Sequence, residues 1–148
     1  MRLRHVIGAG SLALLFASCS LGDSADTRSI NVFVEVDKST LPIGESMTII
    51  TRAKNVGYDP LTLSGPSNCL LWVEILNSQG QVVWRSDTQC SSTSVTETLA
   101  PGQEKSQTFT WAGTNQDGGQ LHGDYHIQPV VRLSGEATAG PLLSVRVE

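Results

Sequence analysis

The sequence has few charged residues and no basic cluster. Charged residues make up 16% of its 148 residues, and 10 Lys and Arg stand against 14 Asp and Glu. A protein that binds nucleic acid needs a basic face, because it must neutralise phosphates. We therefore expect no nucleic-acid partner.

The sequence also lacks the motifs on which common catalytic sites are built. It has no Gly-x-Ser-x-Gly nucleophile elbow, and no glycine-rich phosphate loop that follows a strand and opens a helix. A Ser–His–acid triad would need His122 or His126 as its base, and no motif positions either residue. We expect no enzymatic activity.

Metal-binding patterns are weak. His122, Asp124 and His126 alternate, so a strand would project them to one side. The two histidines would then lie about 13 Å apart, too far to bind one ion. Asn115 and Asp117 lie in a glycine-rich segment, but the full calcium-loop pattern and its closing glutamate are missing. We expect surface histidines, a polar turn, and no metal or cofactor.

The apolar run near the N-terminus is too short to span a membrane. It extends from Val6 to Ala17, about 12 residues, whereas a transmembrane helix needs roughly 20. Arg2 and Arg4 precede it, and small residues close it before Cys19. A basic start, a short apolar stretch and a small-residue end are typical of an export signal.

The placement of Cys19 directly after Ala17-Ser18 resembles the bacterial lipoprotein signal, in which the cleaved chain begins with a lipid-bearing cysteine. The resemblance implies a signal peptide over residues 1–18, palmitate on Cys19, and a flexible tether over residues 19–28. About ten such residues would have a root-mean-square reach of about 17 Å. We expect a lipid-anchored protein of the cell envelope, at the outer membrane or periplasmic side if there are two membranes and at the cell surface otherwise. The alternatives are ordinary secretion with a chance cysteine, or a start codon assigned too far upstream.

The remaining chain has the pattern of a β-domain over residues 29–148. Short segments with apolar residues at alternate positions predict strands, and turn residues separate them every 8–12 positions or so. These segments are 29–36, 46–54, 61–63, 69–77, 81–86, 93–99, 104–111, 124–133 and 142–148. No segment shows a sustained helical period. We predict an all-β fold, an immunoglobulin-like antiparallel β-sandwich of about eight strands.

A hairpin centred on Gln79-Gly80 is the clearest local feature. With a two-residue loop, Glu74 faces Arg85, an opposite-charge pair that favours this register. Leu76 would then face Val83, and the next pair inward would be Ile75 and Trp84.

The same register places two cysteines opposite each other. Extended without a bulge, it places Cys69 opposite Cys90 at a non-hydrogen-bonded site, where Cα atoms lie about 4.5 Å apart. Cysteines outside the cytoplasm tend to oxidise, and an acylated Cys19 could not compete. We predict a Cys69–Cys90 disulfide that closes about 20 residues and stabilises the domain by about 3 kcal/mol.

The hairpin also predicts two faces. One face carries the predicted core residues Cys69, Leu71, Val73, Ile75, Trp84 and Cys90. Leu70 and Trp72 fall on the opposite, half-polar face, which makes them a candidate partner surface. The alternative is that the tether or a neighbouring loop covers them.

Several segments in order resemble the BsuPI-type intracellular proteinase inhibitor domain. They are 53–57, 61–63, 73–85, Leu99-Ala100-Pro101-Gly102-Gln103, Phe109-Thr110-Trp111 and Gly123-Asp124-Tyr125. The similarity covers roughly residues 45–133 and implies a compact β-domain that inhibits serine proteinases. Residues 111–125 also resemble the immunoglobulin-like part of flagellar hook-capping proteins.

Together these features predict a membrane-tethered, extracytoplasmic domain that binds another protein, with a serine proteinase as the specific expectation. The resemblance assigns no inhibitory residue, so the loops beside the cysteines, residues 64–68 and 88–93, are the first candidates. The alternative is a structural or scaffolding immunoglobulin-like lipoprotein of the cell envelope without inhibitory activity.

Overall fold

The computed structural model describes residues 29–148. The predicted signal peptide, the acylation of Cys19 and the tether over residues 19–28 lie outside the described residues. Within residues 29–148 no helix is both long and apolar enough to cross a membrane.

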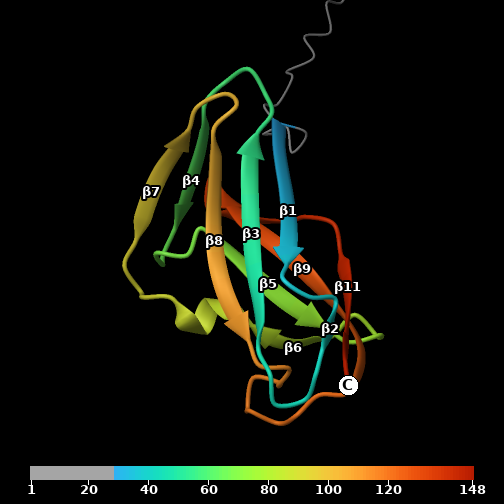
Figure 1. The fold of residues 1–148 in the computed structure, drawn as a ribbon. Coiled ribbons are helices and arrows are strands. Elements are labelled where there is room, and N and C mark those ends of the chain that lie inside the picture. The colour runs from blue at the N-terminus through green and yellow to red at the C-terminus, as the bar shows by residue number, and fades with distance from the viewer. Residues whose placement is uncertain (1–28) are drawn as a thin grey trace, which may run out of the picture.

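The chain folds into two packed β-sheets, which confirms the predicted all-β, immunoglobulin-like sandwich. One sheet has the order β1-β3-β8, and the other has the order β2-β11-β9-β4-β7, with β5 and β10 also paired to β9 and β6 paired to β5. In Figure 1 the three-stranded sheet lies in front of β5 and β9, which run obliquely behind it. The elements are β1 (Ile30–Val36), β2 (Thr40–Leu41), β3 (Met47–Asn55), β4 (Leu61–Gly65), β5 (Leu71–Leu76), β6 (Val82–Arg85), a short 3-10 helix η2 (Ser86–Gln89), β7 (Val95–Leu99), β8 (Glu104–Trp111), β9 (Gly123–Leu133), β10 (Glu136–Ala139) and β11 (Leu143–Val147).

Alternation along β3 shows why these segments form strands. Met47, Ile49, Thr51 and Ala53 are fully buried, while the alternate residues Thr48, Ile50 and Arg52 are only partly buried. One face of the strand therefore packs into the core, and the other faces solvent. Antiparallel pairing with β1 on one side and β8 on the other satisfies the backbone of β3.

The core lies between the two sheets and has an aromatic centre. The rings of Trp84 and Trp111 have centroids 6.5 Å apart, and Trp111 meets Tyr125 edge-on at 6.3 Å. The Trp111 indole nitrogen donates a 2.9 Å hydrogen bond to the Thr114 carbonyl, so its polar atom is satisfied inside the core.

Two strands lie where the sequence predicted connections. The short β2 pairs in parallel with β11, Thr40 opposite Arg146 and Leu41 opposite Val147, so one pair in this sandwich departs from the antiparallel prediction. The second strand, β10, pairs with the end of β9. Both are short segments whose extended form depends on the edge offered by a neighbouring strand rather than on local alternation.

The predicted hairpin register is correct at its centre and wrong near its turn. Glu74 pairs with Arg85, and Ile75 pairs with Trp84, as predicted. Leu76 instead faces Val82, because the register shifts by one between Ile75 and Leu76.

The shift originates in the loop. The Asn77 backbone nitrogen donates to the Gln81 carbonyl, so three residues form the connection rather than two. Gly80 takes a φ of +77°, a left-handed conformation that glycine adopts without steric cost. A bulge at Val83 then restores the predicted register.

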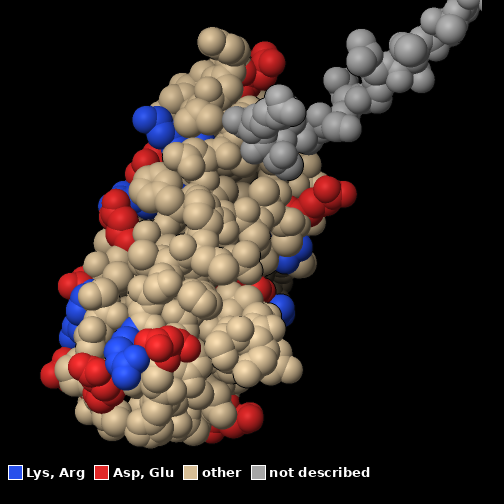
Figure 2. Space-filling model, turned by 90° about the vertical axis from the view of Figure 1, so that its right-hand side faces the viewer, with Lys and Arg blue, Asp and Glu red and all other residues tan. Residues whose placement is uncertain are grey.

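Charges of both signs lie side by side on the surface. The face in Figure 2 carries blue and red groups next to one another, within a mostly uncharged surface. Arg52, for example, lies 3.1 Å from Glu35 and 2.9 Å from Glu104. The hydrogen bond with Glu104, and then that with Glu35, raises the pKa of Arg52 above its ordinary value.

Candidate functional site

The disulfide connects two exposed loops into one surface, and the Cys69–Cys90 prediction is confirmed. The two Cα atoms lie 5.6 Å apart. Beside the disulfide, the Asn68 backbone nitrogen donates to the Ser91 carbonyl at 3.1 Å, and the Ser91 nitrogen donates to the Asn68 side-chain oxygen at 2.8 Å. We call residues 64–68 and 88–93 the disulfide-linked loops.

Cys90 reaches its partner by a different route from the predicted one. Strand β6 ends at Arg85, and the chain then turns through η2, so Cys90 lies beyond the hairpin ladder. The Cys90 nitrogen donates to the Asp87 carbonyl at 3.0 Å, which closes the turn. The buried Ser86 hydroxyl accepts a 2.9 Å hydrogen bond from the Val73 nitrogen and holds the turn against β5. The strand register therefore predicted the correct pair although no ladder extends to Cys90.

The surface of these loops is small and polar. The segment from Ser91 to Ser94 is exposed and leads into β7, which ends the order of the larger sheet. Neither loop contains Lys, Arg or an aromatic residue, and the exposed Asp87 lies just before the second loop. The loops can therefore offer a partner a short peptide backbone with hydroxyl side chains.

The predicted partner surface at Leu70 and Trp72 is wrong, because both side chains are buried. Leu70 is 0% exposed and Trp72 is 6% exposed. Strand β5 begins at Leu71, so the alternation used for the prediction does not extend to Leu70. By alternation Trp72 falls on the face of β5 opposite Val73, yet it belongs to the buried hydrophobic cluster, and the guanidinium of Arg132 on β9 lies 5.0 Å from the centre of its ring.

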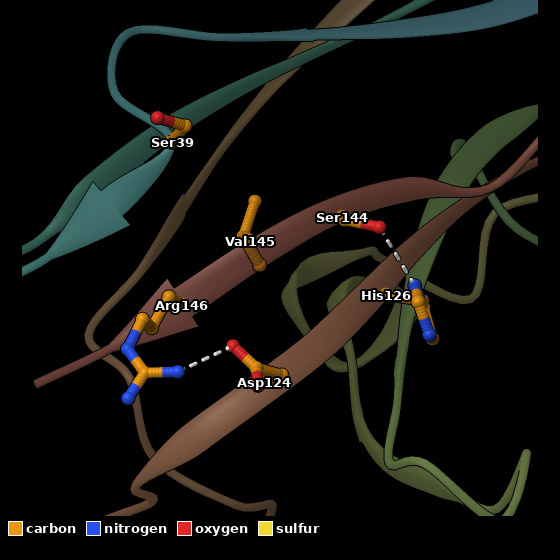
Figure 3. A pocket seen from close by; sticks show the side chains of 6 residues that line it. All are labelled: Ser39, Asp124, His126, Ser144, Val145 and Arg146. Carbon is orange, nitrogen blue, oxygen red and sulfur yellow. Dashed lines mark hydrogen bonds and ion pairs between the residues drawn. The ribbon is translucent and has the colours of Figure 1, made fainter.

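A shallow pocket of about 260 Å³ lies on β9 and β11, as Figure 3 shows. Its lining residues are Ser39, Asp124, His126, Ser144, Val145 and Arg146. Two cross-strand pairs form its floor, Ser144 opposite His126 and Arg146 opposite Asp124.

The pocket contains a serine, a histidine and an aspartate, but their hydrogen bonds do not follow the Ser–His–acid order of a catalytic triad. The Ser144 hydroxyl lies 3.2 Å from His126 Nδ1, while the Asp124 carboxylate accepts a 2.8 Å hydrogen bond from Arg146. No carboxylate lining the pocket orients the imidazole, since Asp124 turns to Arg146 in Figure 3. The hydrogen bond that Arg146 donates to Asp124 raises the pKa of Arg146 above its ordinary value, and a second hydrogen bond, to Glu148, raises it further.

The residues considered for metal binding do not form one group, because His122 lies outside the pocket that Asp124 and His126 line. His122 precedes β9 and does not line the pocket, and its carbonyl accepts a hydrogen bond from the Tyr125 hydroxyl at 3.1 Å. The Asn115 side-chain oxygen accepts from the backbone nitrogens of Asp117 and Gly119, as in a polar turn. Across residues 29–148, no group of three or more His, Cys, Asp or Glu side chains could hold a metal ion.

One exposed element leaves no trace in the alternation of the sequence, the loop between β3 and β4. Tyr58 in this loop is 98% exposed, and the preceding Asn55 is fully buried. Tyr58 lies between Gly57 and Asp59-Pro60, outside the segments in which apolar residues alternate. Asn55 followed two residues later by Gly57 was the available signal, because an Asx-type turn commonly uses this spacing.

No protein-family model matches the sequence, and no curated protein matches it. Among solved structures, the chain is similar to the alkylpurine DNA glycosylase AlkC of Pseudomonas fluorescens, with a TM-score of 0.51, 10% identity, and coverage of 81% of this chain and 30% of that one. It is similar to the sporulation control protein Spo0M of Bacillus subtilis, with a TM-score of 0.50, 15% identity, and coverage of 81% and 49%. A CARDB domain from Pyrococcus furiosus has a TM-score of 0.48, 18% identity, and coverage of 80% and 87%. At these identities the likeness extends to the fold alone.

Proposed function

We propose that this protein is a membrane-tethered, extracytoplasmic β-domain that binds another protein, and that its target is a serine proteinase. The observation that carries the proposal is the pair of disulfide-linked loops. They are exposed or partly exposed, yet a disulfide and two hydrogen bonds constrain them. The resemblance to the BsuPI-type inhibitor domain supports a proteinase as the partner.

Constraint matters because a proteinase binds its ligand as an extended backbone in a cleft. A loop that is already held in one conformation loses less entropy when it binds. The segment from Ser91 to Ser94 projects between the disulfide and β7, so both of its ends are fixed to the domain. It is the segment that we assign to the proteinase cleft.

The side chains of the loops indicate the kind of proteinase. Serine proteinases select their substrates through a pocket that is acidic, a hydrophobic slot, or small. The disulfide-linked loops contain no cation for an acidic pocket and no aromatic ring for a deep slot. Their serine and threonine side chains fit a proteinase with a small pocket.

A titration tests the proposal. The purified protein is added to a panel of serine proteinases with acidic, hydrophobic and small specificity pockets, and peptide hydrolysis is measured. We expect slowing at micromolar protein or below. Ser92→Asp should weaken the inhibition at least about tenfold, because a hot-spot change at the centre of an interface costs more than about 1.4 kcal/mol. The matched control is Ser78→Asp. Ser78 is an exposed serine in the loop between β5 and β6, away from the disulfide-linked loops, and this variant should inhibit like the wild type.

The panel and a membrane pull-down together separate inhibition from scaffolding. No slowing of any proteinase at micromolar protein counts against inhibition. If the pull-down then recovers an envelope assembly and no proteinase, the scaffolding alternative replaces our proposal.

A further inference from the structure

The loop between β3 and β4 presents two apolar side chains to solvent. We call residues 56–60 the Tyr58 loop. Tyr58 is 98% exposed and Val56 is 52% exposed. A tyrosine is seldom left so open in a folded domain, since its ring gains stability from burial. Asp59 carries the only charge within these five residues.

The Tyr58 loop is held rigidly by the buried Asn55. The Asn55 side-chain nitrogen donates to the carbonyls of Asp59 at 2.8 Å and of Leu99 at 2.9 Å. Its side-chain oxygen accepts from the Gly57 nitrogen at 2.9 Å. The exposure of Tyr58 is thus a property of a fixed backbone, and the ring is preorganised for contact.

The N-terminal end of the domain meets the same loop. The backbone nitrogens of Val56 and Gly57 donate to the Ser29 carbonyl at 2.8 and 3.2 Å. A Cβ on Gly57 would lie only 2.7 Å from the Ser29 Cβ, so glycine permits this close approach. In Figure 1 the β3–β4 loop lies at the top, beside the start of β1. The chain that leads back to Cys19 therefore leaves the domain at the Tyr58 loop.

We propose that the Tyr58 loop rests in the headgroup layer of the membrane to which the protein is tethered. The inference depends on the proposed lipid anchor at Cys19. About ten residues separate that cysteine from Ser29, a root-mean-square reach of about 17 Å. Such a short tether gives the loop a high effective concentration at the surface, so a weak contact suffices. Tyrosine prefers this interface because its ring is apolar and its hydroxyl is polar.

The proposed contact orients the domain relative to the membrane. In the β4–β7 ladder, Leu61 pairs with Leu99 at the end near the Tyr58 loop, and Gly65 pairs with Val95 at the other end. The disulfide-linked loops begin at that other end, about 13 Å further along the strands. A membrane-facing Tyr58 loop therefore leaves the proposed binding loops turned away from the lipid.

The test replaces the native anchor, so that it does not depend on acylation. The chain from residue 20 carries an N-terminal hexahistidine tag in place of Cys19 and is bound to phosphatidylcholine vesicles that contain a nickel-chelating lipid. Asp59→Cys is labelled with an environment-sensitive fluorophore. The label leaves the loop intact, because Asn55 bonds to the backbone carbonyl of Asp59. Ser92→Cys, labelled in the same way, reports on the other end of the domain.

We expect the label at position 59 to shift to the blue on tethering and to be quenched by a spin-labelled lipid, while the label at position 92 is not. Adding Tyr58→Ser should abolish the quenching at position 59, and Tyr58→Trp should retain it. Ile43→Ser is the matched control, an apolar residue 49% exposed at the other end of β3, and it should leave the quenching unchanged.

Equal quenching at positions 59 and 92, no quenching at 59, or quenching that survives Tyr58→Ser would each overturn the inference. These outcomes are separate from a failure of the lipid anchor itself, which mass measurement of Cys19 in the native protein would reveal. Quenching at position 59 of the nickel-tethered chain, together with a native Cys19 that carries no acyl group, would show that the loop can contact lipid but would refute the anchor and, with it, the membrane placement of the native protein.

Discussion

The side chain of Asn55 donates a 2.9 Å hydrogen bond to the carbonyl of Leu99, 44 residues further along the chain. The contact joins the end of β3 in one sheet to the end of β7 in the other. Asn55 is fully buried, and its hydrogen bond to Leu99 is buried as well, which strengthens this bond. One polar side chain thus connects the two layers of the sandwich and shapes the Tyr58 loop.

Asn55→Ala should lower the free energy of unfolding by about 3 kcal/mol, because it leaves buried carbonyl and amide groups without partners. Urea denaturation monitored by tryptophan fluorescence measures the change. The control is Asn31→Ala, an exposed asparagine on β1, which should change stability by less than about 0.5 kcal/mol. Equal effects of the two substitutions on the free energy of unfolding would show that the hydrogen bonds of Asn55 add no more stability than an exposed asparagine does.

Removal of the disulfide by Cys69→Ala with Cys90→Ala should cost about 3 kcal/mol, since the reduced chain gains conformational entropy when unfolded. The measurement is the urea midpoint with and without dithiothreitol. Reductant should destabilise the wild type and leave the double variant unchanged. Free thiols at both positions in the native protein, detected by alkylation and intact mass, would contradict the structure.

Arg132→Ala should expose Trp72 and move the tryptophan emission to longer wavelength. It should also lower the free energy of unfolding by about 1–2 kcal/mol, through loss of the cation–π contact and of aliphatic packing. Arg132→Met keeps the aliphatic cover and should preserve the emission. The control is Arg146→Ala, whose exposed ion pairs contribute little to stability. An unchanged emission in Arg132→Ala would mean that other side chains shield the ring.

Cys19→Ala should leave the chain either unprocessed or released from the membrane, because acylation requires the thiol. Membrane and soluble fractions, together with the mass of the mature protein, provide the readout. Ser20→Ala is the neighbouring control and should remain anchored. Unchanged membrane retention of Cys19→Ala would refute the lipid anchor.

Much of the fold could be predicted because strand formation leaves a local pattern. Alternation placed β3 and β9 within about a residue of their observed bounds, and the Glu74–Arg85 pair set the centre of the hairpin correctly. The loop length could not be predicted, since Gly80 suits both two-residue and three-residue connections. The resulting bulge moved Val82 into the position opposite Leu76.

The candidate site was predicted only in part. The loops beside Cys69 and Cys90 were identified, because a pair of cysteines can be recognised directly in the sequence and the adjacent loops follow from it. The burial of Leu70 and Trp72 was not, because it depends on contacts between distant segments, such as that of Trp72 with Arg132 some 60 positions away, which local periodicity does not report. The pocket at His126 likewise depends on the cross-strand position of Ser144.

By itself, the sequence determined the fold class, the inward faces of the long strands and the identity of the bonded cysteines, because each follows from spacing along the chain. Only the tertiary structure decided which edges β2 and β10 join, what covers Trp72, and how Asn55 holds Tyr58 in solvent. These features arise from contacts between segments far apart in the chain, where the neighbouring surface and not the local pattern determines burial and pairing.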